Sequence, residues 1–557
     1  MIQHAKRISV TVIMTSLFVL MVSAQNNNPV FTRADSLRGS LNAERAYNVL
    51  KYEIAFTPDY ENKSIQGENT MTYIDSGMQT MQVDLQMPLV IDSIIQNGKS
   101  LTFQREGNAF HIDLNTKGNN NNCSNCPRKM SIYFHGHPNI AINPPWDGGF
   151  VFSKDAMGRP WISVTCEGIG ASIWFPCKDY LGDEPDSGAS LTITVPDSLV
   201  AVGNGRLVKK TNPSKGMTSW TWAVTNPINN YNIIPYIGKY VNWKQTYYGQ
   251  KGNLDCSFWV LDYNLKKAKK HFTSVDSVLN CFEYWFGPYP FYEDGYKLVE
   301  SSYLGMEHQS NIAYGNQYLQ GYLGNDPSMT GWGLKWDYII VHESSHEWFG
   351  NNITCKDIAD EWIHESFAAY SETLYIGFYF GQQAADAYNF ASRNDIKNDF
   401  PIIQYYGVNR EPAGGDLYYK GANMIHTIRQ VMHNEEIFRK MLRGLNQQFY
   451  HQTVNASDIQ SYMNKISGID FTPVFNQYLR SSKIPVLEYK FETGRVFYRW
   501  TNCNADFNMP VKVDIHGEHW LRPTTDWKKE RISNAAHPVL QVDRNFYVNT
   551  KNSTGKL

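Results

Sequence analysis

The hydrophobic periodicity of this chain changes near residue 266, which limits it to folds that keep strand-rich and helix-rich parts separate. Between about residues 45 and 245, short alternating stretches such as Tyr47–Ile54 and Leu191–Val195 are bounded by Gly and Asn, a pattern typical of β-strands. From Lys267 to Trp285 the apolar residues recur at helical spacing, and Gly287 ends the segment. Further helical segments are predicted near 334–349, 361–380, 421–448 and 457–480.

We expect a multidomain α+β protein. Its 557 residues suggest about three or four domains at roughly 100–200 residues each. The predicted units are a β-rich N-terminal domain at 25–250, a mostly helical domain at 251–480 and a small β-sandwich domain at 481–557, where Val486–Tyr489 and Val511–Ile515 alternate again. A net charge of −2, without a long charged run, gives no electrostatic reason to expect nucleic acid or an anionic membrane as a partner.

The first 24 residues have the pattern of a secretory signal. Lys6 and Arg7 precede an apolar run from Ile8 to Val22, and small residues follow up to Ala24. The run is short for a bilayer core of about 30 Å, and no other stretch is long and apolar enough to cross a membrane. The sequence therefore predicts a signal cleaved after Ala24 and export to the periplasm or the extracellular space, with an uncleaved anchor as the alternative.

Eight cysteines in a chain of this size do not indicate a disulfide scaffold. Cys123 and Cys126 form a C-x-x-C in an Asn-rich loop, with no second pair at metal-binding spacing. In an oxidising compartment a local disulfide between them is the better interpretation than a zinc or redox site. The pairing of the other six does not follow from the sequence.

One helical stretch carries the strongest chemical signal in the chain. His342 and His346 lie four positions apart and therefore share one face of a helix. Two imidazoles at this spacing can bind one metal ion, and Glu343 beside them can take a proton from a metal-bound water. A solvated helix face is the alternative reading, but the flanking residues are apolar and aromatic, where two unpaired imidazoles are costly to bury.

A catalytic zinc ion takes three protein ligands and keeps one position open. Glu365 is the candidate third ligand, because it opens the next amphipathic segment with eighteen residues between it and His346. His364 is a rival, but its side chain points about 100° away on a helix. Glu372 lies two turns further on, where either a carboxylate supporting the ligands or a plain surface residue is expected. The predicted cofactor is one Zn²⁺ ion.

The stretches HESSHEWFG and WIHESFAAYSE, with their spacing of eighteen, resemble the zinc signature of the M1 family. These are the gluzincin aminopeptidases, which include aminopeptidase N and leukotriene A4 hydrolase. The resemblance implies a thermolysin-like, mostly helical zinc catalytic domain at 251–480. It also implies His342, His346 and Glu365 as zinc ligands and Glu343 as the catalytic acid–base.

A second stretch, Leu304–Gln309, resembles the G-A-M-E-N exopeptidase motif of that family. The resemblance implies that Glu307 binds the substrate's ammonium group, by a charge-assisted hydrogen bond. It also implies that the backbone of Gly305 and Met306 lies along the substrate as an added strand. The chain departs from the motif at Leu304-Gly305 and at His308, which puts side-chain preference in doubt but not the carboxylate.

Two further stretches extend the resemblance. Thr165–Gly168, followed by Trp174–Asp179, is similar to the N-terminal-domain segment that supplies a second amine-binding residue, here Glu167. Leu417–Gly421 resembles the Y-x-K-G motif of the family, which implies that Tyr418 is the catalytic tyrosine that donates to the oxyanion. Tyr419 is the neighbour that a slip of one residue would select.

The sequence thus predicts a zinc-dependent aminopeptidase that hydrolyses peptides with a free amino terminus. A zinc endopeptidase or other zinc hydrolase is the second hypothesis, against which the two amine-binding acids argue. A catalytically inactive, peptide-binding relative is the third, against which the intact ligand set argues. Neither the preferred first residue nor an oligomeric state follows from the sequence.

Overall fold

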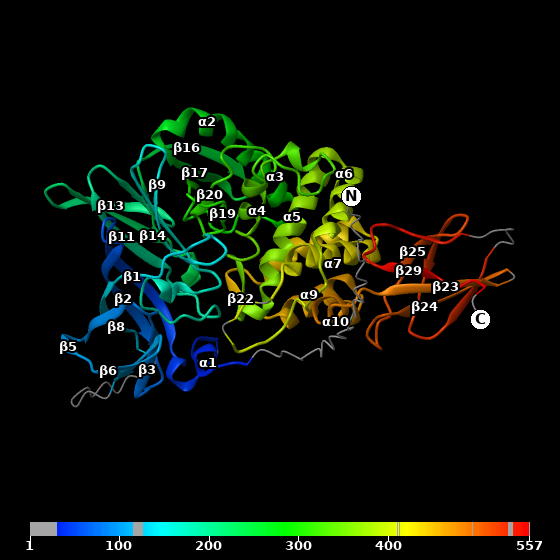
Figure 1. The fold of residues 1–557 in the computed structure, drawn as a ribbon, viewed down its shortest axis with the longest axis horizontal. Coiled ribbons are helices and arrows are strands. Elements are labelled where there is room, and N and C mark those ends of the chain that lie inside the picture. Colours follow the sequence, from blue (N-terminus) through cyan, green and yellow to red (C-terminus); the bar gives the residue numbers. More distant parts are fainter. Residues whose placement is uncertain are drawn as a thin grey trace, which may run out of the picture.

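The computed structural model describes residues 30–555 except 40, 115–125, 409, 412, 493 and 533–538. The predicted signal at 1–24 therefore lies outside the described residues. Figure 1 shows three parts along the long axis: a strand-rich N-terminal part, a helical middle part and a strand-rich C-terminal part. The predicted multidomain α+β class is confirmed.

The N-terminal part is built on an eight-stranded sheet in the order β13-β14-β11-β1-β2-β8-β4-β5. Burial alternates along strands such as β1, so that one face packs on the core, whereas the edge strand β13 is exposed along nearly its whole length. Strand β1 pairs in parallel with β11 and antiparallel with β2. The strands are β1 (Asn48–Asp59), β2 (Ser64–Ile74), β4 (Val90–Gln96), β5 (Lys99–Ser100), β8 (Arg128–Gly136), β11 (Ala189–Pro196), β13 (Arg206–Ser214) and β14 (Met217–Val224).

Two smaller sheets complete this part. One has the order β12-β15-β10-β9 and the other β3-β7-β6. The loop after β10 carries Glu167 toward the middle of the molecule. The strands are β3 (Thr80–Asp84), β6 (Phe103–Glu106), β7 (Ala109–Asp113), β9 (Gly149–Lys154), β10 (Pro160–Thr165), β12 (Val200–Val202) and β15 (Tyr236–Gly238).

A five-stranded sheet lies beside the helices in the order β16-β17-β18-β20-β19. Strands β16 (Tyr240–Gly249) and β17 (Gly252–Leu261) pair along their whole length. The predicted boundary at residue 250 stays a prediction and falls in the turn between them. The remaining strands are β18 (Tyr296–Glu300), β20 (Ile312–Tyr314) and β19 (Gly305–Met306), which is the edge strand.

Helices fill the middle part from residue 265 onward. They are α2 (Leu265–His271), α3 (Val275–Phe286), α4 (Tyr338–Ser345), α5 (Trp362–Phe380), α6 (Gln382–Ala391), α7 (Asp416–Met432), α8 (Glu435–Gln448), α9 (Ala456–Ser467) and α10 (Thr472–Leu479). Short strands β21 (Ile353–Cys355) and β22 (Gln452–Val454) pair in parallel beside them.

Two helices that the periodicity predicted as continuous are each divided, so those two predictions were wrong. The segment 421–448 breaks at His433, whose φ of 46° is left-handed, and Asn434 then caps α8 by accepting from the Ile437 amide. The segment 457–480 breaks at Gly468, with φ 69°, before α10 begins at Thr472 with Pro473 in its first turn. Apolar periodicity runs through such a break because both helices pack on one core.

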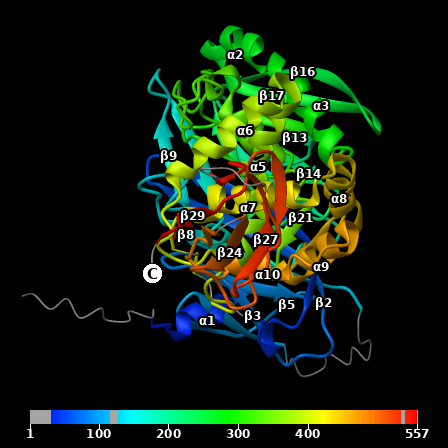
Figure 2. The ribbon, with the colours of Figure 1, turned by 90° about the vertical axis from the view of Figure 1, so that its right-hand side faces the viewer.

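The C-terminal part consists of two small sheets, in the orders β27-β24-β23-β29 and β26-β25-β28. Figure 2 shows these strands in front of α7 and α10. The hydrogen bonds across this contact include one from Tyr478 Oη to Tyr547 O at 2.6 Å and one from Tyr547 N to Thr427 Oγ1 at 3.1 Å. The strands are β23 (Val486–Glu492), β24 (Arg495–Thr501), β25 (Val511–Asp514), β26 (Glu518–Leu521), β27 (Lys528–Arg531), β28 (Gln541–Val542) and β29 (Asn549–Asn552).

Two further sequence expectations concern cysteines and membranes. Cys126 is disulfide-bonded, in line with the local C-x-x-C interpretation, while Cys123 lies outside the described residues. The six other cysteines form no disulfide, and five of them are buried. None of the helices that the structure describes has the length and apolar character needed to span a bilayer.

Candidate active site

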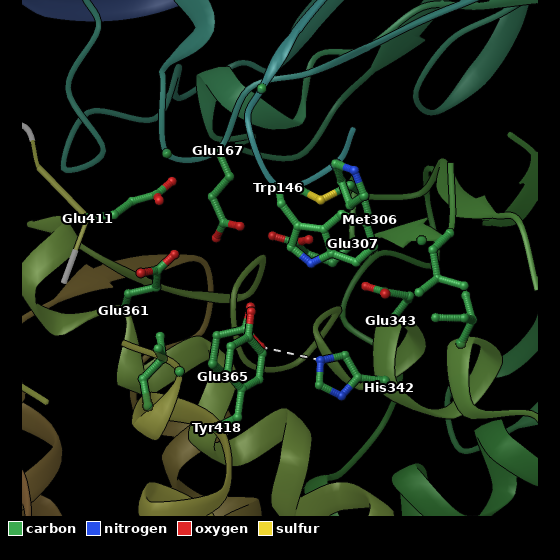
Figure 3. A pocket seen from close by; sticks show the side chains of 18 of the residues that line it. Trp146, Glu167, Met306, Glu307, His342, Glu343, Glu361, Glu365, Glu411 and Tyr418 are labelled. Atoms are coloured by element: carbon green, nitrogen blue, oxygen red, sulfur yellow. Dashed lines mark hydrogen bonds and ion pairs between the residues drawn. The ribbon is translucent and has the colours of Figure 1, made fainter. Parts of the chain in front are cut away.

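A cavity of about 500 Å³ opens where the N-terminal part meets the helices. The loop after β10 and the loop before β9 form one wall, and β19, α4, the start of α5 and the loop before α7 form the others (Figure 3). Its lining residues include Trp146, Glu167, Gly305, Met306, Glu307, His342, Glu343, Glu361, Glu365, Glu411 and Tyr418. All but one of the site residues predicted from the sequence thus line a single cavity. The remaining one is His346, whose ring centroid lies 5.0 Å from that of His342.

Two helices bring a His-His-Glu group together beside this cavity. Asp337 caps α4 by accepting from the Ile340 amide at 3.0 Å. His346 is the first residue after α4, and its backbone still has helical dihedral angles. Glu365, in the first turn of α5, places Oε2 3.3 Å from His342 Nε2 and 3.7 Å from His346 Nε2. All three side chains are buried, and their ligand atoms lie within 4.8 Å of one another. Two imidazole nitrogens and one carboxylate are a donor set that fits one zinc ion.

The Nδ1 atom of each histidine makes a hydrogen bond elsewhere, which leaves both Nε2 atoms facing the point where the three ligands converge. His342 Nδ1 donates to Glu372 Oε1 at 2.9 Å, and His346 Nδ1 donates to Phe349 O at 2.9 Å. Glu372 is wholly buried and also accepts from Tyr388 Oη at 2.7 Å. The surface alternative for Glu372 is therefore wrong. Partners of this kind fix the tautomer and orientation of a metal-binding histidine.

The rival ligand His364 points away from the cluster. Its Nε2 accepts from the Cys355 amide at 2.9 Å, and burial lowers its pKa to about 3. Its Nδ1 lies 3.5 Å from Glu167 Oε1 instead. The one-residue rotation expected on a helix thus separates His364 from Glu365.

Glu343 stands beside His342 and faces the cavity (Figure 3). Burial raises the pKa of its carboxyl well above the ordinary value, against the opposing effect of His342. The carboxylate approaches β19 so closely that a Cβ built on Gly305 would lie 2.5 Å from Glu343 Oε1. Glycine at 305 therefore leaves the space that this carboxylate occupies.

Two more carboxylates point into the same space from the opposite wall. Glu307 is buried, its Oε1 accepts from Tyr231 Oη at 2.9 Å, and its backbone carbonyl accepts from Asn351 Nδ2 at 2.7 Å. Figure 3 shows Glu167 next to Glu307, although the two come from different parts of the chain. Burial raises the pKa of Glu167 well above its ordinary value, and Glu307 raises it further. Such a pair favours a cation between its members.

Strand β19 borders the cavity at the edge of the five-stranded sheet. Gly305 pairs with Tyr314 and Met306 with Ala313 on β20, and β20 is its one neighbour in the sheet order. Its other edge is therefore open to an extended chain, because an edge strand presents unpaired backbone groups.

Tyr418, and not its neighbour, belongs to the cavity. The Tyr418 ring lies 6.2 Å from the His342 ring, between centroids. Tyr419 does not line the cavity, and its Oη lies 3.3 Å from Oη of Tyr338, which does. The start of α7 is held by Ser366 Oγ, which donates to Leu417 O at 2.6 Å.

Sequence reasoning missed several residues of the site. Glu361 and Glu411 line the cavity, Trp146 forms part of its wall, and Tyr231 and Tyr388 hold carboxylates in place. Glu361 was visible four positions before Glu365, one helical turn away, and that spacing was the available signal. The other four lie in segments whose approach to the site depends on the folded chain.

The comparisons with known proteins agree with one another on the family that this chain resembles. The family model described as the peptidase family M1 domain matches residues 264–478. The chain is 20% identical to "Probable aminopeptidase 2" of Sulfurisphaera tokodaii, over 84% of this chain and 59% of that protein. It is 24% identical to human "Endoplasmic reticulum aminopeptidase 1", over 57% of this chain and 34% of that protein. The chain thus spans three fifths or less of the length of these two curated relatives.

A solved structure shares the fold. A mutant of an M1 zinc metallopeptidase from Deinococcus radiodurans superposes with a TM-score of 0.64 at 18% identity, covering 78% of this chain and 94% of that one. The likeness extends over part of the N-terminal strands as well as the helices, because 78% of the chain is more than all the residues from 264 to 557.

Proposed function

Because residues 264–478 of this chain are a peptidase family M1 domain, we propose that the protein is a zinc-dependent aminopeptidase. It would remove residues from peptides with a free amino terminus. One observation carries the proposal: the buried His342-His346-Glu365 group faces the same cavity as the Glu307–Glu167 pair. A hydrolytic centre and a cation site in one cavity select the amino-terminal peptide bond. A Deinococcus radiodurans structural neighbour was solved with a Tyr-Ser-Ala substrate, which supports a peptide as the ligand here.

Glu343 and Tyr418 would perform the proton chemistry. A zinc ion held by the His-His-Glu group supplies Lewis-acid activation of water and of the scissile carbonyl. Glu343 takes the proton of the attacking water and returns it to the leaving nitrogen, a role that its raised pKa suits. Tyr418 donates its hydroxyl to the oxygen on which negative charge develops.

The remaining residues would set where the peptide is cut. Glu307 and Glu167 hold the substrate ammonium, and each replaces part of the hydration that the cation loses. The open edge of β19 aligns the substrate backbone as an added strand. A peptide with a blocked amino group would leave the buried Glu307 and the partly buried Glu167 next to each other without a cation, which disfavours internal cleavage.

Glu343→Gln tests the proposal. It removes the proton acceptor but keeps the size of the side chain, so aminoacyl-peptide hydrolysis should fall by about 10²–10⁴ while zinc stays bound at one ion per chain. The readouts are cleavage of aminoacyl fluorogenic substrates and metal content. Retained cleavage by this variant, or cleavage of amino-acetylated peptides by the wild type, would contradict the aminopeptidase assignment.

We also propose export, on the basis of the signal pattern at residues 1–24. The protein would act in the periplasm or outside the cell, where the disulfide of Cys126 is stable. Amino-terminal sequencing of protein from the periplasm and the medium checks this, and a mature chain should begin at Gln25. An intact Met1 on cytosolic protein would contradict it.

A further inference from the structure

The cavity contains more acid than the proposed chemistry uses. Its carboxylates are those of Glu167, Glu307, Glu343, Glu361, Glu365 and Glu411. Among its lining residues in the described part of the chain there is no Lys and no Arg. The proposed roles account for four of the six, because Glu365 binds zinc, Glu343 moves a proton, and Glu307 and Glu167 bind an ammonium group. Glu361 and Glu411 have no role there.

Glu361 is buried and aimed into the cavity without a partner. Only 9% of the residue is exposed, and within the described chain its carboxylate makes no hydrogen bond and no ion pair, nor does it cap α5. Its own carbonyl accepts from the amides of His364 and Glu365, at 2.9 and 3.1 Å, so its backbone is fixed. A buried carboxylate without a donor is costly, and a bound cation would offset that cost.

Glu411 lies next to Glu361 (Figure 3), and it is solvent-exposed at the rim of the cavity. Its carboxylate packs directly on Gly168, where a Cβ would fall 1.1 Å from Glu411 Oε1. The nearest cation in the sequence, Arg410, points elsewhere: its guanidinium lies 3.7 Å from Asp35 and covers the Phe31 ring at 5.3 Å.

The position of these two acids assigns them to one part of a substrate. In Figure 3 they lie beyond Glu167, on the side away from Glu343. A first residue whose ammonium is held at Glu307 and Glu167 has its carbonyl near the His-His-Glu group. Its side chain can then extend along the cavity past Glu167, toward Glu361 and Glu411.

We infer that Glu361 and Glu411 form a specificity pocket for a cationic first side chain, so that the preferred substrates begin with Arg or Lys. This inference rests on the proposed aminopeptidase function and specifies its substrate class. The charge count supports it. A zinc ion, an ammonium group and one side-chain cation together carry four positive charges against six carboxylates. With a neutral first residue the positive charges number only three.

The first experiment compares substrates of equal shape and different charge. Wild-type enzyme is assayed on aminoacyl amides of arginine against citrulline and of lysine against norleucine. A charge-assisted bond to a buried carboxylate predicts kcat/KM at least about 10-fold higher for each charged member. Equal rates within a pair, or faster cleavage of the neutral member, would overturn the inference while leaving the aminopeptidase function intact.

The second experiment locates the preference. Glu361→Gln should lower kcat/KM for the arginine substrate by about 10- to 100-fold and change that for citrulline less than about threefold, because only one charge is lost. Glu411→Gln should act in the same direction but more weakly, since that side chain is exposed. Glu436→Gln, on the exposed start of α8, removes an equal charge elsewhere and should leave the ratio unchanged. An unchanged ratio in Glu361→Gln would overturn the assignment.

A binding measurement distinguishes failure of the specificity pocket from failure of the proposed aminopeptidase function. Calorimetry on the zinc-loaded Glu343→Gln protein compares L-argininamide with L-citrullinamide, which requires no hydrolysis. Tighter binding of argininamide that is lost in the Glu343→Gln, Glu361→Gln double variant supports the pocket, even if the wild type cleaves nothing and the proposed function fails. Equal binding of the two ligands overturns the pocket whether or not the enzyme is active.

Discussion

Replacing Glu372 should weaken zinc binding although this residue is not a ligand. Its carboxylate is wholly buried and accepts two hydrogen bonds, from His342 Nδ1 at 2.9 Å and from Tyr388 Oη at 2.7 Å. Glu372→Leu removes both acceptors, so the imidazole loses the group that orients it and keeps its proton on Nδ1. Glu372→Gln loses the charge but retains an oxygen for His342.

The magnitude follows from the hydrogen bond to His342. A hydrogen bond to a charged group contributes about 1.5–3 kcal/mol. At about 1.4 kcal/mol for each factor of ten, this is roughly 10- to 150-fold in zinc affinity. The range agrees with the roughly 10- to 100-fold typical of residues that support metal-binding histidines. We expect Glu372→Leu near the upper end and Glu372→Gln near the lower end.

Competition with a fluorescent chelator at fixed pH measures the zinc Kd of each variant. Tyr388→Phe is the matched control, because it removes one donor to Glu372 but leaves the bond to His342, and it should change Kd only a few-fold. Thermal unfolding in excess zinc shows whether each variant is folded. A folded Glu372→Leu protein with wild-type zinc affinity would refute the reasoning.

Two further predictions concern catalysis and pH. Tyr418→Phe should lower kcat by about 10²–10³-fold with KM little changed. The control Tyr419→Phe changes a residue that does not line the cavity, and its kcat should stay within about threefold of the wild type. Equal losses of kcat in the two variants would contradict the assignment of Tyr418. Burial lowers the pKa of His426 to about 3, so the folded state binds fewer protons than the unfolded state below pH 6.5, and stability falls as pH drops. Denaturant unfolding between pH 6.5 and 5 measures how steeply the free energy of unfolding falls with pH. In His426→Gln this fall should be smaller than in the wild type by about 1.4 kcal/mol per pH unit. An unchanged pH dependence would contradict the role of His426.

Much of the architecture followed from local pattern. Alternating stretches predicted the N-terminal and C-terminal strands, and helical spacing predicted α5 close to its observed bounds. Helices α3 and α4 fall within the predicted segments but are shorter than them. The two divided helices were missed because a left-handed His433 and a Gly468 cap end a helix without interrupting the apolar stripe. Periodicity reports which face is buried, and it does not report where the backbone turns.

The sequence by itself determined the parts of the site that lie within one or two helical turns. His342, Glu343 and His346 owe their relation to the helix repeat, and so does the preference for Glu365 over His364. Such relations are set by backbone geometry over a few residues, so they can be read before the chain is folded.

Only the tertiary structure decided which distant groups share the cavity. Glu167 reaches it on a loop of the N-terminal part and Glu411 on a loop of the helical part. Glu372 lies on α5, so its contact with His342 depends on how α5 packs against α4. No repeat length relates these residues. Their distances result from the packing of separate sheets and helices on common cores, where each contact depends on all the others.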